Sequence, residues 1–258
     1  MFEYRDYLAS IEYSKRVYGD KEGLMKTLKY EKDMEKRDKY IRTKFQEACL
    51  NGHYEIVKIL LEYVDIKNSD SDAALHNACV CWQHRIVKLL LDNGAKVNVK
   101  DNNGNSHLHI ACEYGSFRGS EPCDTVKVLL ENGADVNSMN NKGETSFCCA
   151  SDIKTIKLLL AYGLNVNKVN TCGDNILHEM CSRYQYRKDV GMFKLMTNCE
   201  VNINAKNVYG ETPLMIAQKH ESYYIANLLM KEMKKRIYIM SLMINSDVTK
   251  NYIVKKID

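Results

Sequence analysis

The stretch Ser106–Asn137, SHLHIACEYGSFRGSEPCDTVKVLLENGADVN, contains two short motifs that return along the chain. The first, SHLHIA at Ser106–Ala111, has counterparts at Ala73–Ala78 (AALHNA) and Thr212–Ala217 (TPLMIA). The second is TVKVLL at Thr125–Leu130, and its lysine (asparagine in the last copy) recurs at positions 58, 88, 127, 157, 194 and 227. The spacings of 30, 39, 30, 37 and 33 residues average close to 34. This period predicts a repeat protein with insertions and deletions.

Each motif predicts one helix of a two-helix repeat. Serine or threonine at the start of the first motif is a good helix cap, and Pro213 suits a first helical turn. In the second motif, apolar residues such as Val87, Leu90 and Leu91 form one stripe on a helix. A helix pair of this size cannot bury its apolar face alone, so neighbouring repeats are expected to stack. Leu90 and Leu129 are expected to lie at the buried seam.

These motifs, together with the connection Asn132–Asn137 (NGADVN), resemble the ankyrin repeat over roughly residues 20–233. The resemblance implies an all-α solenoid of stacked helix pairs with β-hairpin-like connections, and about six to seven repeats including degenerate caps. We expect residues 1–41 to form a degenerate N-terminal cap or half repeat and residues 42–233 to form the repeats. Residues 234–258 are then a C-terminal capping helix and tail.

Irregular spacings between the motifs locate the variable loops. The third repeat has about six extra residues within 116–123, and the fifth has about four within 184–189, both between the two helices of a repeat. The fourth repeat is about three residues short at the same place. Extra residues at such junctions are expected to be solvated, where binding residues are often found.

Composition narrows the class of protein. The 258 residues are 45% hydrophobic and 27% charged with a net charge of +4, which argues against disorder and gives no support for nucleic acid as a partner. No apolar run approaches the roughly 20 residues of a membrane span, and the start shows no secretory signal pattern. Ten cysteines without an export signal indicate reduced thiols in a cytoplasmic or nuclear protein.

The sequence gives little support for a catalytic or metal site. Cys49, Cys79, Cys112 and Cys181 follow the small residue of the first motif, a slot that favours helix packing. A zinc site from His76, Cys79, Cys81 and His84 can be drawn, but His76 recurs as His109 and His178 in the first motif, where ankyrin repeats use it to brace the next hairpin. Cys148 and Cys149 are a second, redox alternative. No nucleophile-elbow, phosphate-loop or zincin motif occurs. We therefore expect neither an enzyme nor a cofactor or metal.

Ankyrin repeats generally bind other proteins, so the resemblance implies a partner-binding surface on hairpin tips, inner-helix ends and helix–helix junctions. The positions that match are Trp82, Asn102, Asn103, Asn105, Tyr114, Phe117, Arg118, Lys142, Glu144, Arg183, Tyr184, Tyr186, Tyr209 and Lys219. Trp82, the only tryptophan, stands in a turn where the family usually has glycine, and we expect it to be largely solvated. The alternative is that Trp82 folds back over the gap beside Cys81.

Two further features have a functional and a structural interpretation. Asn137 lies in a sequence similar to the hairpins that asparaginyl hydroxylases modify in ankyrin proteins; alternatively, it only closes its hairpin. Lys234–Arg236 (KKR) is either a nuclear localisation signal or the solvated face of a capping helix.

The amino-acid composition also resembles that of proteins from one kind of genome. Lys outnumbers Arg 28 to 9, and the chain has 17 Tyr but only 2 Pro, a bias resembling the ankyrin proteins of poxviruses or another AT-rich genome. This implies a monomeric, non-catalytic viral factor that binds and sequesters a host signalling or antiviral protein. The alternative is an adaptor that links a target to a ubiquitin ligase through its C-terminal tail.

Overall fold

The computed structural model describes residues 20–30, 32–66, 69–113, 122–150, 152–182 and 190–254. The chain divides into two compact units, residues 1–164 and residues 165–258, which we call the N-terminal and C-terminal units. The N-terminal unit contains α2 (Lys21–Tyr30), α3 (Met34–Asn51), α4 (Tyr54–Leu60), α5 (Ser69–Val80), α6 (His84–Asp92), α7 (His107–Glu113), α8 (Pro122–Glu131), the 3₁₀ helix η1 (Ser146–Cys149) and α9 (Ile153–Ala161). The C-terminal unit contains α10 (Ile176–Ser182), α11 (Val190–Thr197), α12 (Pro213–Lys219) and α13 (Tyr223–Val254).

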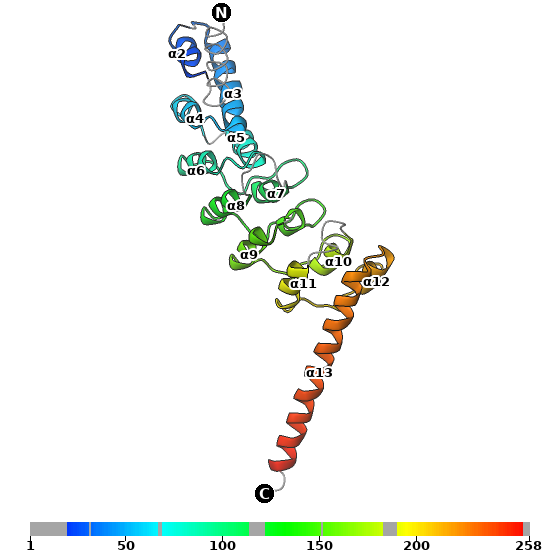
Figure 1. Cartoon of the computed structure of the whole chain (residues 1–258). Helices are drawn as coiled ribbons and strands as arrows, with labels where there is room; N and C mark the ends of the chain where they lie inside the picture. Colours follow the sequence, from blue (N-terminus) through cyan, green and yellow to red (C-terminus); the bar gives the residue numbers. More distant parts are fainter. Residues whose placement is uncertain are drawn as a thin grey trace, which may run out of the picture. The chain divides into compact units, whose positions relative to one another are not determined.

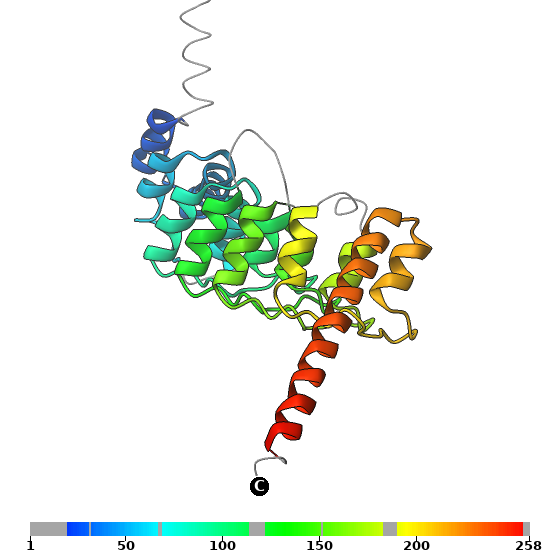
Figure 2. The same ribbon diagram turned by 60° about the horizontal axis from the view of Figure 1, so that its bottom comes forward.

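Two rows of helices build the N-terminal unit (Figure 1). The first helices of the repeats, α3, α5, α7 and η1, contact one another in that order, and the second helices α4, α6, α8 and α9 do the same. Figure 2 shows this second row from the side, with its helices nearly parallel. This is the stacked-pair, all-α solenoid that the sequence predicts.

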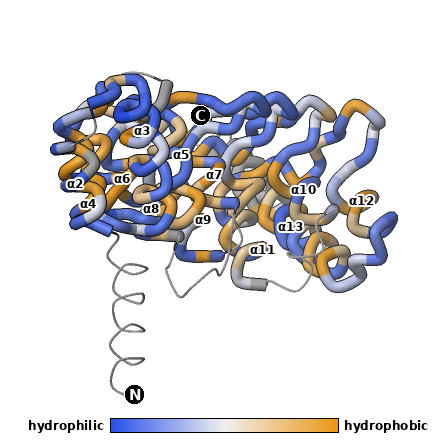
Figure 3. The backbone as a smooth tube through the Cα atoms, turned by 90° about the horizontal axis from the view of Figure 1, so that it is seen from above, coloured by the Kyte–Doolittle hydropathy of each residue, from blue (hydrophilic) through white to orange (hydrophobic). Residues whose placement is uncertain are grey.

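The core of this unit lies where the two rows meet. Figure 3 shows hydrophobic residues gathered on the helices of the second row, α4, α6, α8 and α9. Leu90 and Leu129, the residues expected at the seam, are completely buried. So are Phe45, Leu75 and Leu159, which makes the apolar core continuous from α3 to α9.

The connections between repeats are hairpin-like. Isolated antiparallel bridges join Lys100 to Ser106 and Met139 to Thr145. Successive hairpins are joined as well, because the Asn141 N–H donates to the Asn103 carbonyl at 2.9 Å. Gly104, at φ 77°, sits at this close approach, where a Cβ atom would lie 2.8 Å from the Asn141 nitrogen. Only glycine fits this turn.

Both predicted domain boundaries fall inside helices. The boundary at 41/42 lies within α3, which begins at Met34 with Asp33 as its cap, the Asp33 carboxylate accepting from the Lys36 N–H at 3.1 Å. The boundary at 233/234 lies within α13. Neither helix contains Gly or Pro, so nothing in the chain interrupts them, and the expected C-terminal cap is the continuation of the last repeat's second helix.

The short junction in the fourth repeat has a direct structural counterpart. Its first helix is reduced to the single 3₁₀ turn η1, and Asp152 then caps α9 by accepting the Thr155 N–H at 2.8 Å. The longer junctions of the third and fifth repeats lie outside the described residues. No helix within the described ranges is both long enough and apolar enough to cross a membrane.

Candidate functional site

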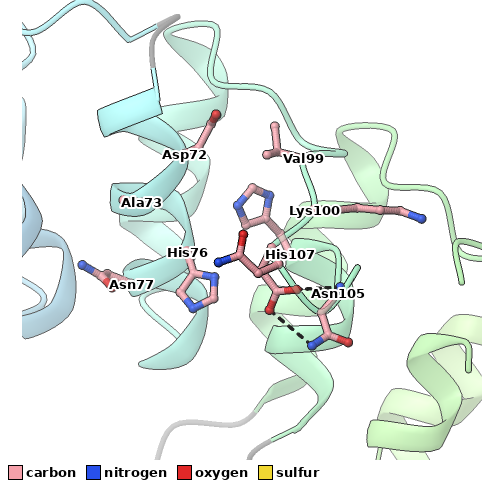
Figure 4. A pocket seen from close by; sticks show the side chains of 10 residues that line it. Asp72, Ala73, His76, Asn77, Val99, Lys100, Asn105 and His107 are labelled. Atoms are coloured by element: carbon pink, nitrogen blue, oxygen red, sulfur yellow. Dashed lines mark hydrogen bonds between the residues drawn. The ribbon is translucent and has the colours of Figure 1, made fainter. Parts of the chain in front are cut away.

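A pocket of about 410 Å³ opens between α5 and the connection that leads into α7. We call it the His76 groove. Its lining residues are Asp72, Ala73, His76, Asn77, Val99, Lys100, Asp101, Asn102, Asn105 and His107. Figure 4 shows the imidazoles of His76 and His107 turned toward the same space, one from α5 and the other from the start of α7.

The groove exists because His76 is not braced as its counterparts are. In the next repeat, His109 Nδ1 accepts the Ser106 N–H at 3.2 Å, and its Nε2 contacts the Glu144 carbonyl at 3.0 Å. Because Nδ1 is an acceptor, Nε2 carries the proton and donates to that carbonyl. His178 repeats the pattern with the Asn175 N–H at 3.1 Å and the Glu211 carbonyl at 3.0 Å. The bracing role expected for these histidines is thus present at two positions.

At His76 the residue that should donate to Nδ1 is Ala73, and it lies inside α5. Since α5 begins at Ser69, the Ala73 N–H is used within the helix instead of being free at a cap. Within the described part of the chain, neither the His76 ring nor the Asn77 amide forms a hydrogen bond to another residue. The groove is the space that remains between them and the hairpin.

His107 forms the inner wall of the groove. It is 4% exposed, and its Nδ1–H donates to the Val97 carbonyl at 3.1 Å. Burial lowers the pKa of this imidazole, and the hydrogen bond to Val97 only partly opposes that effect. The neutral ring therefore dominates at pH 7.

Asp101 and Lys100 form the rim on the hairpin side. Asp101 Oδ1 accepts the backbone N–H groups of Asn103 at 2.9 Å and Asn105 at 2.8 Å, which fixes the turn. The Lys100 ammonium points away from the groove in Figure 4 and donates to the Met139 carbonyl at 2.7 Å. The carboxylates of Asp72 and Asp101 are therefore the charges that remain at the groove.

The structure places the predicted hairpin-tip residues, and Lys219 at a predicted inner-helix end, in two groups. The exposed ones are Asn102, Asn103, Lys142, Tyr209 and Lys219, with Tyr209 72% exposed. Asn105 and Glu144 are partly buried, and the Asn140 amide donates to both at 3.0 Å. The bond to Asn105 joins neighbouring hairpins, whereas the bond to Glu144 lies within one hairpin. Both side chains therefore present less surface than expected.

The predicted binding residues at the helix–helix junctions fall on segments of uncertain placement. Tyr114, Phe117, Arg118, Arg183, Tyr184 and Tyr186 all lie outside the described residues.

The expectation that Trp82 is largely solvated is wrong, because its side chain is buried. It is 2% exposed, and its indole Nε1–H donates to the Ala111 carbonyl at 3.0 Å. Its φ of 50° is the left-handed conformation of the glycine that usually occupies this turn. The ring is thus buried, as in the alternative interpretation, but its indole bonds the next repeat, which that interpretation did not anticipate. Trp82 is therefore not available to a partner.

Asn137 also has a structural role. Its Nδ2 donates to the Gly163 carbonyl at 2.9 Å, and Asn98 makes the equivalent bond to the Gly133 carbonyl at 3.0 Å one repeat earlier. Closing the hairpin against its neighbour therefore accounts for this residue, and hydroxylation of Asn137 remains a prediction.

The cysteines behave as packing residues in this structure. Cys49, Cys79, Cys112 and Cys181 are all buried, and burial raises the pKa of Cys49 and Cys181 to about 12. Among the residues that the structure describes, no group of three or more His, Cys, Asp or Glu side chains is placed to hold a metal ion. The drawn zinc set, His76 to His84, is accordingly not assembled there.

The sequence motifs did not indicate that Asp72, Asn77 and His107 line a groove. The available signal was Ala73, which stands where the other repeats have Ser106, Thr145 or Thr212. Loss of the cap lets α5 extend toward its N-terminus and changes the environment of His76.

Comparisons with known proteins agree with this architecture. The family model for ankyrin repeats (3 copies) matches residues 16–101, 46–140, 83–170 and 145–240. An ankyrin repeat protein of fowlpox virus is 33% identical over 87 residues, covering 33% of this chain and 60% of that protein. NF-kappa-B inhibitor alpha of Gallus gallus is 39% identical over 56 residues, or 22% of this chain and 18% of the inhibitor.

A yeast protein, the target of rapamycin complex 2 subunit AVO2, is 32% identical over 73 residues, covering 27% of this chain and 17% of that subunit. The alignments thus span 60% of the fowlpox protein and less than a fifth of each of the other two relatives. Ankyrin repeats form non-catalytic protein–protein interaction modules, and the family matches run through most of the chain. This chain is a member of the ankyrin-repeat family.

Proposed function

We propose that the chain binds and sequesters a host signalling or antiviral protein, without catalysis, through the His76 groove and the exposed tips beside it. The observation that carries this proposal is a groove of about 410 Å³, lined mainly by polar residue types, next to the exposed side chains of Asn102 and Asn103. Hairpin tips and first helices together offer a surface large enough for a protein, and not only a small molecule.

Two relatives support the choice of a sequestering role. One is named as an inhibitor of NF-kappa-B and another is a fowlpox ankyrin protein, so short segments similar to this chain occur in an inhibitory and in a viral protein. On this proposal the chain acts as a monomer in the host cytoplasm or nucleus.

Site-specific photo-crosslinking in host cells tests the surface. A crosslinking residue at Asn102, beside the groove, is expected to capture the partner, whereas one at Lys88 is the matched control. Lys88 is equally exposed but lies on α6, in the second row of helices. Capture from Lys88 and not from Asn102 would place the binding surface on the other side of the unit.

A second function, the adaptor, is favoured by one observation on α13. Beyond Arg236 this helix exposes three large apolar side chains, Ile237, Met240 and Leu242, at 65%, 62% and 51%. Clustered exposed apolar residues often mark an interaction surface. Figures 1 and 2 show the same segment extending away from α10 and α12. An apolar helix of this kind suits insertion into a groove of a ligase subunit.

The adaptor is tested by replacing Ile237, Met240 and Leu242 together with serine while keeping Arg236, which anchors α13 to its own unit. Loss of a ubiquitin-ligase subunit from the purified complex, with the target retained, would favour the adaptor. If the complex is unchanged by the triple substitution, sequestration alone accounts for the chain.

A further inference from the structure

We infer that the His76 groove receives an arginine side chain of the protein partner. This inference rests on the proposed function and names the chemical group of the partner that the groove binds. It starts from the contrast among three histidines in the same slot: His109 and His178 are closed against their hairpins, whereas the space beside His76 is open.

The charges at the groove favour a cation. Asp72 on α5 and Asp101 on the hairpin both line the groove, so an acidic residue borders it on each wall. Lys100, the basic residue of the lining, turns its ammonium outward to the Met139 carbonyl. Asp101 already accepts two backbone N–H groups through Oδ1, but its Oδ2 has only the Asn105 amide, at 3.3 Å, and keeps accepting capacity.

The buried imidazole of the lining does not compete for the same charge at neutral pH. His107 is buried, with its pKa lowered by desolvation, so the inner wall of the groove is neutral at pH 7. His76 is partly exposed and presents its ring to the groove, as Figure 4 shows. A planar guanidinium can lie against such a ring and still reach a carboxylate, which a compact ammonium does less well.

The neutral polar groups of the lining complete the match. Asn77 and Asn102 both line the groove, and the amide oxygen of a lining asparagine can accept N–H groups. A guanidinium offers five N–H donors in a fixed plane, so it can be shared between two carboxylates and these amides. The volume of about 410 Å³ accommodates one such side chain with water.

The direct probe is N-acetyl-arginine-N-methylamide, titrated into the full chain at pH 7 while the imidazole ¹H signals of His76 and His107 are followed by NMR. We expect saturable shifts at these two histidines and none at His84, which is exposed on α6. The citrulline analogue, which has the same shape without the charge, is expected to bind about fivefold or more weakly. Equal shifts with citrulline, or none with arginine, would overturn the inference.

Variants separate the groove from general charge effects. Asp72→Asn is expected to weaken arginine-amide binding about fivefold, while Asp124→Asn, an exposed carboxylate on α8, leaves binding unchanged. Ala73→Leu fills the groove without changing its charge and should also abolish the shifts, with circular dichroism confirming that α5 is intact. Retention of binding in both groove variants would contradict the proposed site.

The partner experiment, with crosslinking residues at Asn102 and at Asn77, distinguishes this inference from the proposed function. If crosslinking at Asn102 captures a partner, the cross-linked segment is sequenced. An arginine in the captured segment, and loss of capture in Asp72→Asn, support the inference. Capture that is unaffected by Asp72→Asn overturns the arginine and leaves the proposed function standing. Failure of capture at both Asn77 and Asn102 contradicts the proposed function itself.

Discussion

At position 82 a tryptophan occupies a backbone conformation that glycine usually takes. A φ of 50° costs about 1–2 kcal/mol for an L-residue, and burial of the indole with its bond to the Ala111 carbonyl offsets that cost. Residue 82 therefore links the second repeat to the third, and substitutions there report on stability, not on partner binding.

Trp82→Ala is expected to lower the free energy of unfolding by about 3–5 kcal/mol, because a large buried ring is removed. Trp82→Phe keeps most of the ring but leaves the Ala111 carbonyl without its donor, which should cost about 1–3 kcal/mol. Urea denaturation followed by circular dichroism measures both, since the variants lack the only tryptophan. A urea midpoint for Trp82→Ala equal to that of the parent would contradict burial of the indole.

Acid should weaken the N-terminal unit through its buried histidines. Burial lowers the pKa of His107 and His109 below their ordinary value of 6.5. The unfolded chain then binds protons at higher pH than the folded one, so stability is full above about pH 6.5 and falls as the pH drops toward the folded-state pKa values.

Urea midpoints measured between about pH 7.5 and pH 5 test this pH dependence. His109→Gln should reduce it, whereas His84→Gln, at an exposed position, should leave it unchanged. A parent protein more stable at pH 5 than at pH 7.5 would contradict the assignment of neutral buried imidazoles.

At the scale of elements, α13 combines two roles along one helix. Its first part packs against α12 through Ile225, Ala226 and Leu229. Arg236 marks the end of this packed part, where its guanidinium donates to the carbonyls of Val201 and Thr197, both at 2.9 Å. These bonds satisfy carbonyls at the end of α11 and in the following loop, groups that a helix end leaves unpaired.

Arg236→Ala is expected to destabilise the C-terminal unit by about 1–3 kcal/mol, because two charge-assisted hydrogen bonds are lost. Lys235→Ala, whose side chain is exposed on the same helix, serves as the control and should change stability little. Hydrogen exchange resolved to α11 and α13 measures the effect. Equal behaviour of the two variants would mean that Arg236 does not anchor the helix.

At the scale of the molecule, each repeat is stabilised by its neighbours. α8 contacts α6, α7 and α9, so its buried face supports helices on both sides. In such an array stability is a sum of repeat and interface contributions, and damage at one repeat spreads to the adjacent ones.

Leu129→Ala, at a completely buried position on α8, should cost about 2–5 kcal/mol. The loss of hydrogen-exchange protection should extend to α6 and α9, the flanking helices of the second row. Lys127→Ala, exposed on the same helix, is the control. Damage confined to α8 would contradict nearest-neighbour coupling.

The repeat, the buried seam and two of the three histidines that contact the next hairpin could be predicted from the motifs. The spacing of the motifs is a local property, and each copy carries its own cap, stripe and turn glycine, so the pattern alone suffices to place Leu90, Leu129 and His109. The shortened junction before Asp152 could also be predicted, because it reduces the number of residues between the two motifs of the fourth repeat.

The direction of the Trp82 side chain and the place of the groove could not be predicted, because both depend on contacts between repeats. The indole bonds a carbonyl 29 residues away, and its exposure depends on the neighbouring repeat, not on its own turn. The His76 groove depends on the length that α5 gains when Ala73 replaces a capping residue, and on a hairpin from the following segment. The extents of α3 and α13 were missed for a related reason: repeat motifs mark equivalent positions, whereas a helix continues until a residue stops it.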